Sequence, residues 1–128
     1  MNKIPSIKWL AQARNDLKWT QANIVSKIYY GACFTAQQAT EKALKAYLLQ
    51  KGKRVKIHDL GAILEECKKF DHSFEKLKQA TATLTDYYLE TRYPDIAEFT
   101  KYTQTQAEEA QELATKIIEF VETKIKQP

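Results

Sequence analysis

The sequence predicts an all-α protein, an antiparallel bundle of about five helices. Apolar residues recur at steps of three, four and seven along most of the chain, which is the period of one face of a helix. No segment alternates apolar and polar residues as a half-buried strand would. Glycine and proline occur only three times each, too few for the many turns of a β-sandwich. Short connections between helices then make the antiparallel bundle the economical arrangement.

Length and composition place residues 1–128 in a single domain. The chain has 44% hydrophobic and 28% charged residues, enough to bury one core and keep a charged surface. Its longest apolar runs, such as residues 46–49, are far too short for a transmembrane helix. No apolar segment follows the basic N-terminus, and two cysteines make neither a disulfide framework nor a metal quartet. We therefore expect a cytoplasmic protein that needs no metal or other cofactor and no membrane.

The first helix is expected to begin at Pro5 or Ser6, because proline fits a first turn and serine caps one. The second helix, about residues 29–50, is rich in alanine, which permits close helix approach. Gly52 tolerates a left-handed conformation and is expected to stop this helix. The apolar face of the first helix is made by Leu10, Ala13, Leu17 and Ile24.

A basic loop, residues 51–57, precedes the third helix. His58 or Asp59 is expected to open this short helix, since aspartate is a good N-cap and suits the positive end of a helix. The helix carries a single apolar face, made by Leu60, Ile63, Leu64 and Cys67.

The fourth helix is expected to begin at Ser73. Pro94 disfavours helix at the residue before it, so residues 91–95 are expected to form a loop or turn. The last helix begins between Phe99 and Thr103. Its long apolar stripe is made by Ala107, Ala110, Ala114, Ile117, Val121 and Ile125.

Charge is divided unevenly along the chain. The net charge is +4, but residues 1–60 carry eleven Lys/Arg and three Asp/Glu, a balance of +8, while residues 61–128 carry nine and thirteen, a balance of −4. Such a split can steer an anion to one side of the fold, and it can equally let two copies pair basic face to acidic face. Charge alone does not choose between them.

Most familiar catalytic and ligand signatures are missing. The three glycines are scattered, so they make no phosphate loop, and no Gly-x-Ser-x-Gly turn occurs. His58 and His72 have no partners at zinc-ligand spacing. Three polar features remain as candidates for a site.

The first two candidates lie at the end of the second helix and in the loop after it. Gln38, Glu41, Lys42 and Lys45 fall at helical spacing, so they form either ion pairs on a solvated face or a cationic wall beside a phosphate. The basic loop ends at a helix start whose free N–H groups suit phosphate. Asp59 as a cap would occupy part of that site, and structural capping is the favoured interpretation.

The third candidate is the segment Thr91-Arg92-Tyr93-Pro94-Asp95. Here Arg92 can clamp a phosphate, Tyr93 can stack on a base and Asp95 can accept a hydrogen bond. The alternative is a loop pinned by an Arg92–Asp95 pair. The nearby Tyr87 and Tyr88 fit a core better than a stacking platform.

These segments together resemble a known family. Residues 30–46 resemble the second helix of the HEPN (higher eukaryotes and prokaryotes nucleotide-binding) domain, and His58-Asp59-Leu60, Tyr87-Tyr88 and residues 91–95 follow in the same order. The resemblance spans roughly residues 5–125. It implies a bundle of about five helices, usually a homodimer. Prokaryotic members are often encoded beside a minimal nucleotidyltransferase or fused to one, and many such pairs act as toxin–antitoxin modules.

Some HEPN proteins are metal-independent ribonucleases whose motif is an Arg followed four to six residues later by His, placed at the dimer cleft. This chain departs from that motif. Arg54 and His58 are separated by three residues, and no histidine follows Arg92. A ribonuclease would therefore need the fold to bring His58 as general base to Arg92 or Lys42 as the cation.

Three functions follow from these observations. The leading hypothesis is a homodimeric HEPN domain that acts beside a nucleotidyltransferase, in one version as a toxin–antitoxin component. It would bind a nucleotide or RNA phosphate through Lys42, Lys45, His58, Arg92, Tyr93 and Asp95. The alternatives are a metal-independent ribonuclease toxin that uses His58 and Arg92, and a protein-interaction module without a ligand. Trp9, Trp19 and the alanine-rich second helix lead us to expect the homodimer.

Overall fold

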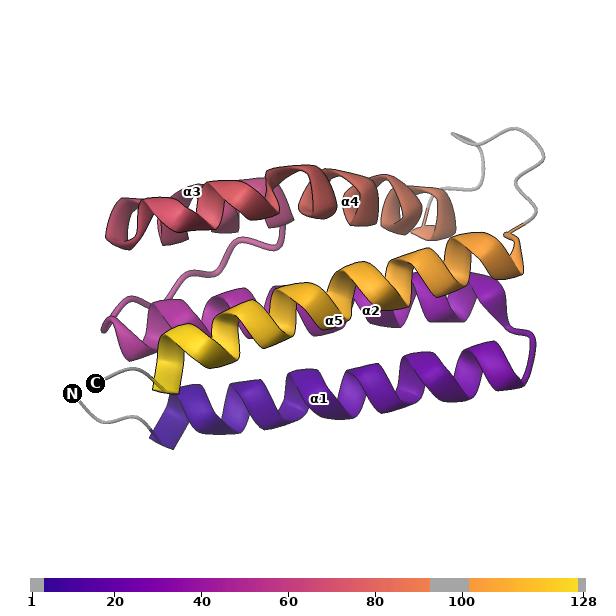
Figure 1. Ribbon diagram of the computed structural model, residues 1–128, viewed down its shortest axis with the longest axis horizontal. Helices are drawn as coiled ribbons and strands as arrows, with labels where there is room; N and C mark the ends of the chain where they lie inside the picture. The colour runs from indigo at the N-terminus through magenta and orange to yellow at the C-terminus, as the bar shows by residue number, and fades with distance from the viewer. Residues whose placement is uncertain (1–3, 93–101, 127–128) are drawn as a thin grey trace.

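The structure is a computed structural model that describes residues 4–92 and 102–126. These residues form five α-helices and one short 3₁₀-helix, and no strand occurs among them. The expected all-α fold of five helices is confirmed (Figure 1). In chain order the elements are α1 (Ile4–Val25), α2 (Tyr29–Gln50), α3 (Leu60–Phe70), η1 (His72–Leu77), α4 (Lys78–Arg92) and α5 (Gln104–Lys126).

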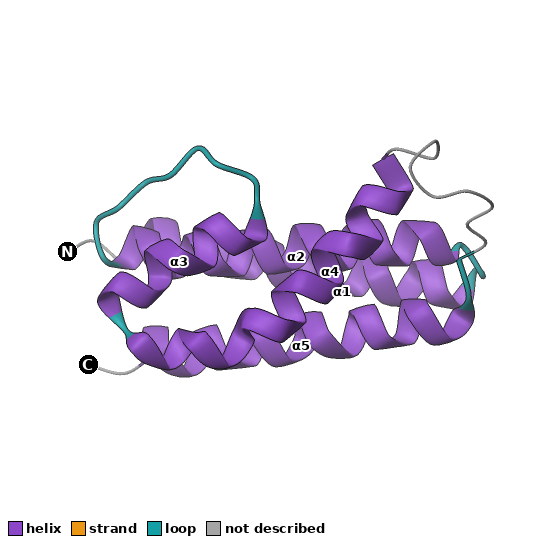
Figure 2. Cartoon of the chain, turned by 90° about the horizontal axis from the view of Figure 1, so that it is seen from above, coloured by secondary structure: helices purple, strands orange, loops and turns teal. Residues whose placement is uncertain are grey.

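Helix α2 is the central element of the bundle. It contacts α1, α3, α4 and α5. Figures 1 and 2 show α1, α2 and α5 as long rods lying side by side, with the shorter α3 and α4 following one another along one side of them. The core lies around α2 and includes Leu44, Leu48, Phe74, Ile117 and Ile118, all fully buried.

The alanines of α2 explain how one helix can contact four others. Their side chains are completely buried, and a methyl group keeps neighbouring backbones close. This confirms the expected close helix approach. Because these alanines are buried within the fold, the alanine-rich face of α2 cannot contact a second copy of the protein, contrary to its use as an argument for a homodimer. The alanines concerned are Ala32, Ala36, Ala39, Ala43 and Ala46.

Helix α2 stops where the sequence predicts. Gly52 has φ 80°, and its N–H donates to the carbonyl of Leu49 at 3.0 Å while the N–H of Lys53 donates to that of Leu48 at 2.8 Å. This is the Schellman arrangement, which satisfies the last carbonyls of a helix and favours glycine at the left-handed position.

Helix α1 ends in the same way, but with lysine at the left-handed position. Lys27 has φ 61°, and its N–H donates to the carbonyl of Ile24 at 3.0 Å. The N–H of Ile28 donates to that of Asn23 at 2.8 Å. A side chain at this φ is strained by about 1–2 kcal/mol, so the turn between α1 and α2 lowers the stability of the fold.

The fourth helix begins later than expected. Residues 72–77 form η1, and α4 starts at Lys78. Asp71, not Ser73, is the capping side chain, because its Oδ1 accepts from the backbone N–H of Ser73 at 3.0 Å and from its Oγ at 2.6 Å. The tight turn formed by these bonds gives the segment i→i+3 geometry before the α-helix begins.

The two ends of the 93–101 segment also differ from expectation. Helix α4 includes Thr91 and Arg92, which the sequence assigns to a loop; proline restricts only the residue before it, so Pro94 does not forbid helix at Arg92. Residues 93–101 lie outside the described part of the chain. Helix α5 begins at Gln104, one residue past the expected interval. Thr103 and Gln106 form a reciprocal capping box there, with bonds of 3.1 and 3.0 Å.

Two further features of the described residues bear on membranes and metals. None of the helices in residues 4–92 and 102–126 is long and apolar enough to cross a bilayer. The same residues contain no group of three His, Cys, Asp or Glu side chains placed to hold a metal ion. Cys33 and Cys67 are both fully buried.

Candidate functional site

Two of the candidate site residues meet on one buried carboxylate. Glu41 lies on α2 and is 8% exposed. Its Oε2 accepts from Lys45 Nζ at 3.0 Å and from His58 Nδ1 at 2.8 Å. Lys45 lies one turn further along α2, whereas His58 follows the basic loop. The i,i+4 ion pair expected from the sequence therefore exists, but it is buried instead of solvated, and it also fixes the end of the loop.

The imidazole of His58 is held from one side only. Its side chain is 80% exposed, and the contact with Glu41 uses Nδ1. When Nδ1–H donates to a carboxylate, Nε2 carries the lone pair and can accept a proton. The exposed edge of His58 is therefore suited to contact a ligand from solvent.

Lys42 faces a different neighbour. Its Nζ lies 2.7 Å from Oδ2 of Asp16 on α1, and Asp16 is 4% exposed. Lys42 and Lys45 thus belong to one stripe on α2, but Lys42 turns toward α1 and Lys45 toward Glu41. Each ammonium is balanced by a buried carboxylate, so these two lysines alone add little net positive charge.

Positive charge without an opposite partner lies in the basic loop, which arches over the end of α2 (Figure 2). Val55 is half-buried against the core, and Arg54 and Lys56 on either side of it are exposed. Neither cation forms an ion pair with any described residue. By contrast, Lys53 is paired with Glu66 of α3, and the ammonium of Lys51 lies 5.5 Å from the centre of the Tyr47 ring.

Arg54 and Lys56 border a small hollow of about 120 Å³. Its other walls come from α1 and α2, where Trp9 is a half-buried aromatic ring and Lys45 supplies part of the floor. The hollow therefore combines cations, an aromatic ring and aliphatic carbon. The complete lining is Trp9, Lys45, Leu49, Arg54, Val55 and Lys56.

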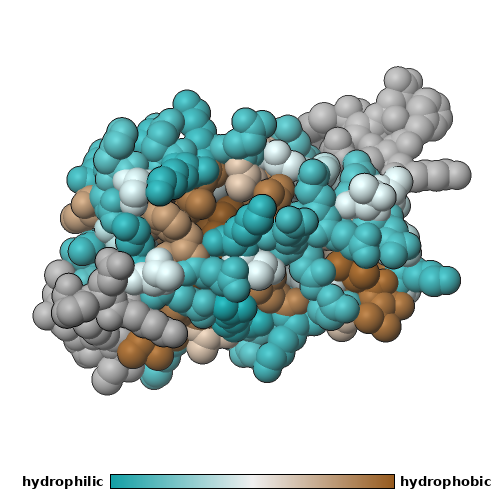
Figure 3. Space-filling model, viewed as in Figure 1, coloured by the Kyte–Doolittle hydropathy of each residue, from teal (hydrophilic) through white to brown (hydrophobic). Residues whose placement is uncertain are grey.

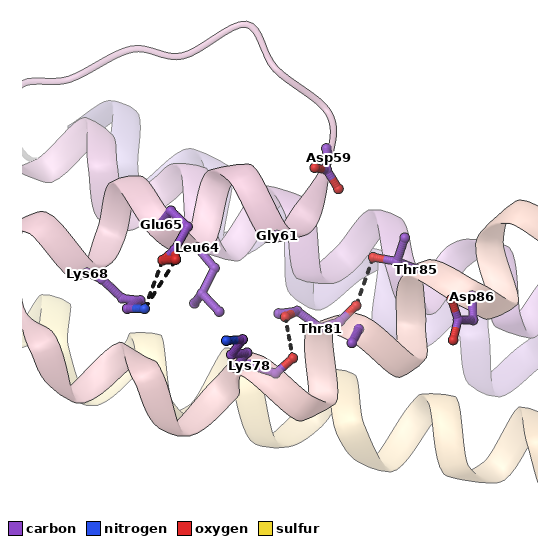
Figure 4. A pocket seen from close by; sticks show the side chains of 10 residues that line it. Asp59, Gly61, Leu64, Glu65, Lys68, Lys78, Thr81, Thr85 and Asp86 are labelled. Atoms are coloured by element: carbon purple, nitrogen blue, oxygen red, sulfur yellow. Dashed lines mark hydrogen bonds and ion pairs between the residues drawn. The ribbon is translucent and has the colours of Figure 1, made fainter.

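Asp59 has the expected position but not the expected contact. It precedes the first residue of α3, yet its carboxylate makes no capping hydrogen bond. It borders a groove of about 410 Å³ between α3 and α4 (Figure 4). The hydroxyls of Thr81 and Thr85, in the same groove, donate to carbonyls of their own helix at 2.9 and 2.8 Å. The groove therefore presents mixed charge without a convergent set of polar groups.

The Arg92 candidate lies toward the other end of α2. Tyr88 stacks on Phe34 with ring centres 5.7 Å apart. Helix α4 runs antiparallel to α2 (Figure 1), so the backbone of Arg92, one turn later, lies beyond Phe34 toward the start of α2. Lys45 is three turns past Phe34 in the opposite direction, about 16 Å along the helix. The side chain of Arg92, together with Tyr93 and Asp95, is outside the described residues.

Sequence reasoning missed two groups at this site. It assigns Trp9 to helix packing or an interface, and Glu41 to a pair on the surface. A cation, an apolar residue and a cation at positions 54–56 follow the two-residue period of an extended chain, and this signal predicts a loop with its cations outward. Nothing in the sequence indicates that Trp9, about forty-five residues earlier, lies beneath them.

The fold and the candidate site together define the class: an all-α helical bundle, built around one alanine-rich central helix, with a cationic loop at the end of that helix. Comparison with known families then specifies it. The HEPN domain profile matches residues 7–124, and the chain belongs to this family.

Two solved structures are similar to the chain over nearly its full length. TT1696 from Thermus thermophilus is 39% identical, with a TM-score of 0.87, and the match covers 97% of this chain and 99% of that one. ST0689, described as an archaeal HEPN homologue, is 28% identical, with a TM-score of 0.79 and coverage of 94% and 98%. Among curated proteins none matches the chain.

Proposed function

We propose that this HEPN protein binds the phosphates of RNA or of a nucleotide, and that it acts beside a minimal nucleotidyltransferase, as many pairs in the family do in toxin–antitoxin modules. The observation that carries the proposal is the group of cations around the end of α2. Lys45 and His58 share Glu41. Arg54 and Lys56, which pair with no described carboxylate, stand over the hollow that Lys45 also lines.

The dimensions of the hollow limit what can enter it. Ligand pockets usually measure about 300–1,000 Å³, whereas this one measures about 120 Å³. It accommodates one phosphate or part of one ring, and the rest of a ligand has to lie across the outer surface. Arg54 can bind two phosphate oxygens at once, and the exposed part of Trp9 offers a face on which a base can stack.

The spread of the candidate residues favours RNA over a single nucleotide. Lys45 and His58 lie at one end of α2, and the backbone of Arg92 lies toward the other. One phosphate cannot touch both places, but a chain of phosphates is long enough to reach from one to the other. Lys42, Tyr93 and Asp95 remain part of this proposed surface. Positive side chains that track a backbone, together with an aromatic platform, are typical of single-strand binding.

Titration of a fluorescent six-nucleotide RNA, ATP and GTP tests the proposal. We expect the Arg54→Ala/Lys56→Ala variant to bind RNA more weakly, and its log–log salt slope to be shallower by about 0.7 for each phosphate that is no longer neutralised. Lys116→Ala is the matched control, because Lys116 is an exposed lysine of α5. Equal binding by the double variant and the wild type would remove the hollow from the site. If wild-type and Arg92→Ala proteins bind equally well, the Arg92 clamp does not exist.

The ribonuclease alternative is favoured by the contact between Glu41 and His58. A buried carboxylate that orients an exposed imidazole is the arrangement of a general base. His58 would take the proton of a ribose 2′-hydroxyl as that oxygen attacks the phosphate. The bond from phosphorus to the 5′-oxygen then breaks, which leaves a 2′,3′-cyclic phosphate and a 5′-hydroxyl that gains its proton from water. A nearby cation would stabilise the developing charge. Incubation with RNA in the presence of a chelator tests this function. Intact RNA, or cleavage that is unchanged in His58→Ala, would contradict it.

Copurification tests whether the protein binds a nucleotidyltransferase, and together with the RNA titration it tests the alternative of an interaction module without a ligand. We expect the tagged protein to retain the product of an adjacent nucleotidyltransferase gene. If complex formation weakens with salt but no RNA or nucleotide binds under any condition, the basic loop serves an acidic protein partner. Absence of phosphate binding together with retained partner binding would therefore support the interaction module.

A further inference from the structure

Lys45 is a buried lysine that has hydrogen-bond donors to spare. The residue is 6% exposed, and its ammonium group has three N–H donors. One of them donates to Oε2 of Glu41 at 3.0 Å, and the other two donate to no atom of residues 4–92 and 102–126. Buried donors are normally satisfied, and Lys45 lines the hollow under the basic loop. The hollow is therefore suited to a group whose oxygens accept from Lys45.

The charged groups around this hollow leave two positive charges unbalanced. Glu41 balances Lys45, and with His58 neutral the cations that remain are Arg54 and Lys56, which have no carboxylate partner in the described part of the chain. A phosphate monoester carries about −1.5 to −2 charge at neutral pH, because its second pKa is about 6. A phosphate within an RNA strand carries a single negative charge. The charge of the hollow therefore matches a monoester better than a diester.

The walls of the hollow favour the end of a strand over its middle. They come from three elements, with Trp9 on α1, Leu49 on α2 and Val55 in the basic loop. The volume of about 120 Å³ equals that of about four water molecules in the liquid, which is room for one phosphate. A phosphate within a strand carries a ribose on both sides, and both would have to leave this small space. A terminal phosphate carries a ribose on one side only.

The position of Trp9 also favours a terminal nucleotide. Its half-buried ring lines the same hollow as Lys45. A base in the middle of a stacked strand has a neighbour on each face, whereas the last base has one free face that can stack on an aromatic ring. The nucleotide at the end of a strand can therefore bring its phosphate to Lys45 and its base to Trp9.

We propose that the hollow selects the terminal phosphate monoester of an RNA strand. Lys45, Arg54 and Lys56 bind its oxygens, and Trp9 stacks on the terminal base. This selectivity rests on the phosphate binding proposed above, and it specifies which phosphate of the strand enters the hollow. A 5′-phosphate and a 3′-phosphate share the same chemistry, so the binding experiment distinguishes the two ends.

Three six-nucleotide RNAs of one sequence, each labelled at an internal base, test this selectivity. One carries a 5′-phosphate, one a 3′-phosphate, and the third has hydroxyls at both ends. We expect at least one phosphorylated RNA to bind about tenfold or more tightly than the third, because the hydrogen bonds that depend on the extra charge are lost with the phosphate. Equal affinity of all three overturns the selectivity but leaves the proposed function standing, whereas binding of none contradicts both.

A double variant tests whether the preference arises at the hollow. Arg54→Gln/Lys56→Gln keeps polar side chains but removes both charges, and we expect it to bind phosphorylated and unphosphorylated RNA equally. The control is Lys116→Ala, which should keep the preference. Lys116 is an exposed lysine of α5, which lies across the bundle from the basic loop (Figure 2) and on the largely hydrophilic face seen in Figure 3.

Circular dichroism verifies that both variants are folded, which we expect because the substituted side chains are exposed. A preference for phosphorylated RNA that survives in the double variant overturns the assignment of this preference to the hollow.

Discussion

Removal of Glu41 is the sharpest test of how the candidate site is built. The side chain of Lys45 is 8% exposed and that of Glu41 10%, so Glu41→Ala leaves a buried ammonium without its partner. Breaking a buried pair from one side costs about 3–5 kcal/mol. We expect about 3 kcal/mol, at the lower end, because Lys45 borders the hollow and reaches water with a small movement. This is a large part of the roughly 5–15 kcal/mol that stabilises a domain.

Urea unfolding followed by helical circular dichroism at neutral pH measures this destabilisation. With a slope of about 2 kcal/mol per molar urea, the midpoint should fall by about 1.5 M. Glu112→Ala is the control, because Glu112 and Lys116 form an exposed pair at 3.5 Å, and such pairs contribute about 0–1 kcal/mol.

The double variant Glu41→Met/Lys45→Met distinguishes two free energies: the destabilisation caused by one unpaired buried charge, and the net contribution of the intact ion pair. Replacing both members of a buried pair by apolar residues is often close to neutral, so we expect it to unfold within about 1 kcal/mol of the wild type. A Glu41→Ala midpoint less than about 0.5 M below that of the wild type would refute the reasoning, since Lys45 would then be solvated without Glu41.

Three further predictions concern single features of the fold. Lys27→Gly should stabilise the protein by about 1 kcal/mol in urea unfolding, because glycine relieves the left-handed strain; Lys27→Ala should give no gain. Burial raises the pKa of the Cys67 thiol to about 12, and Cys33 is also buried, so a thiol reagent at about pH 8, near the usual pKa of an exposed thiol, should label neither until urea unfolds the chain. Hydrogen bonds from Ser73 lower the pKa of Asp71 from 3.8 to about 2. This stabilisation is complete above about pH 4 and is lost as pH falls through about 2. In Asp71→Asn the free energy of unfolding should therefore depend less on pH between those values than it does in the wild type.

The fold was predictable because its main determinants are local. The apolar period locates the helices, and Gly52 stops α2 through a conformation that glycine favours. The predicted helix boundaries are wrong where a hydrogen bond between a side chain and the nearby backbone decides where the helix begins. Asp71 turns the next residues into η1, and Thr103 sets the start of α5 through its own capping box. Such side-chain bonds move the start of α5 by one residue and that of α4 by five, without changing the pattern of apolar residues.

The site was less predictable because it depends on contacts between distant segments. Spacing on α2 places Glu41 beside Lys45, but spacing does not show that α1 carries Asp16 to Lys42 or that a loop returns His58 to Glu41. It also groups Lys42 with Lys45, although the two ammonium groups face different carboxylates. Helical periodicity gives the direction of a side chain, whereas its partner depends on the topology.

The two parts of the candidate site should respond differently to salt. Arg54 and Lys56 are exposed cations, and salt weakens the binding of such cations to phosphate. The ion pair between Glu41 and Lys45 is buried, and salt screens a buried pair much less. Raised salt should therefore weaken RNA binding while the Glu41–Lys45 pair continues to stabilise the fold. An RNA affinity that does not change with salt would show that Arg54 and Lys56 contact no phosphate.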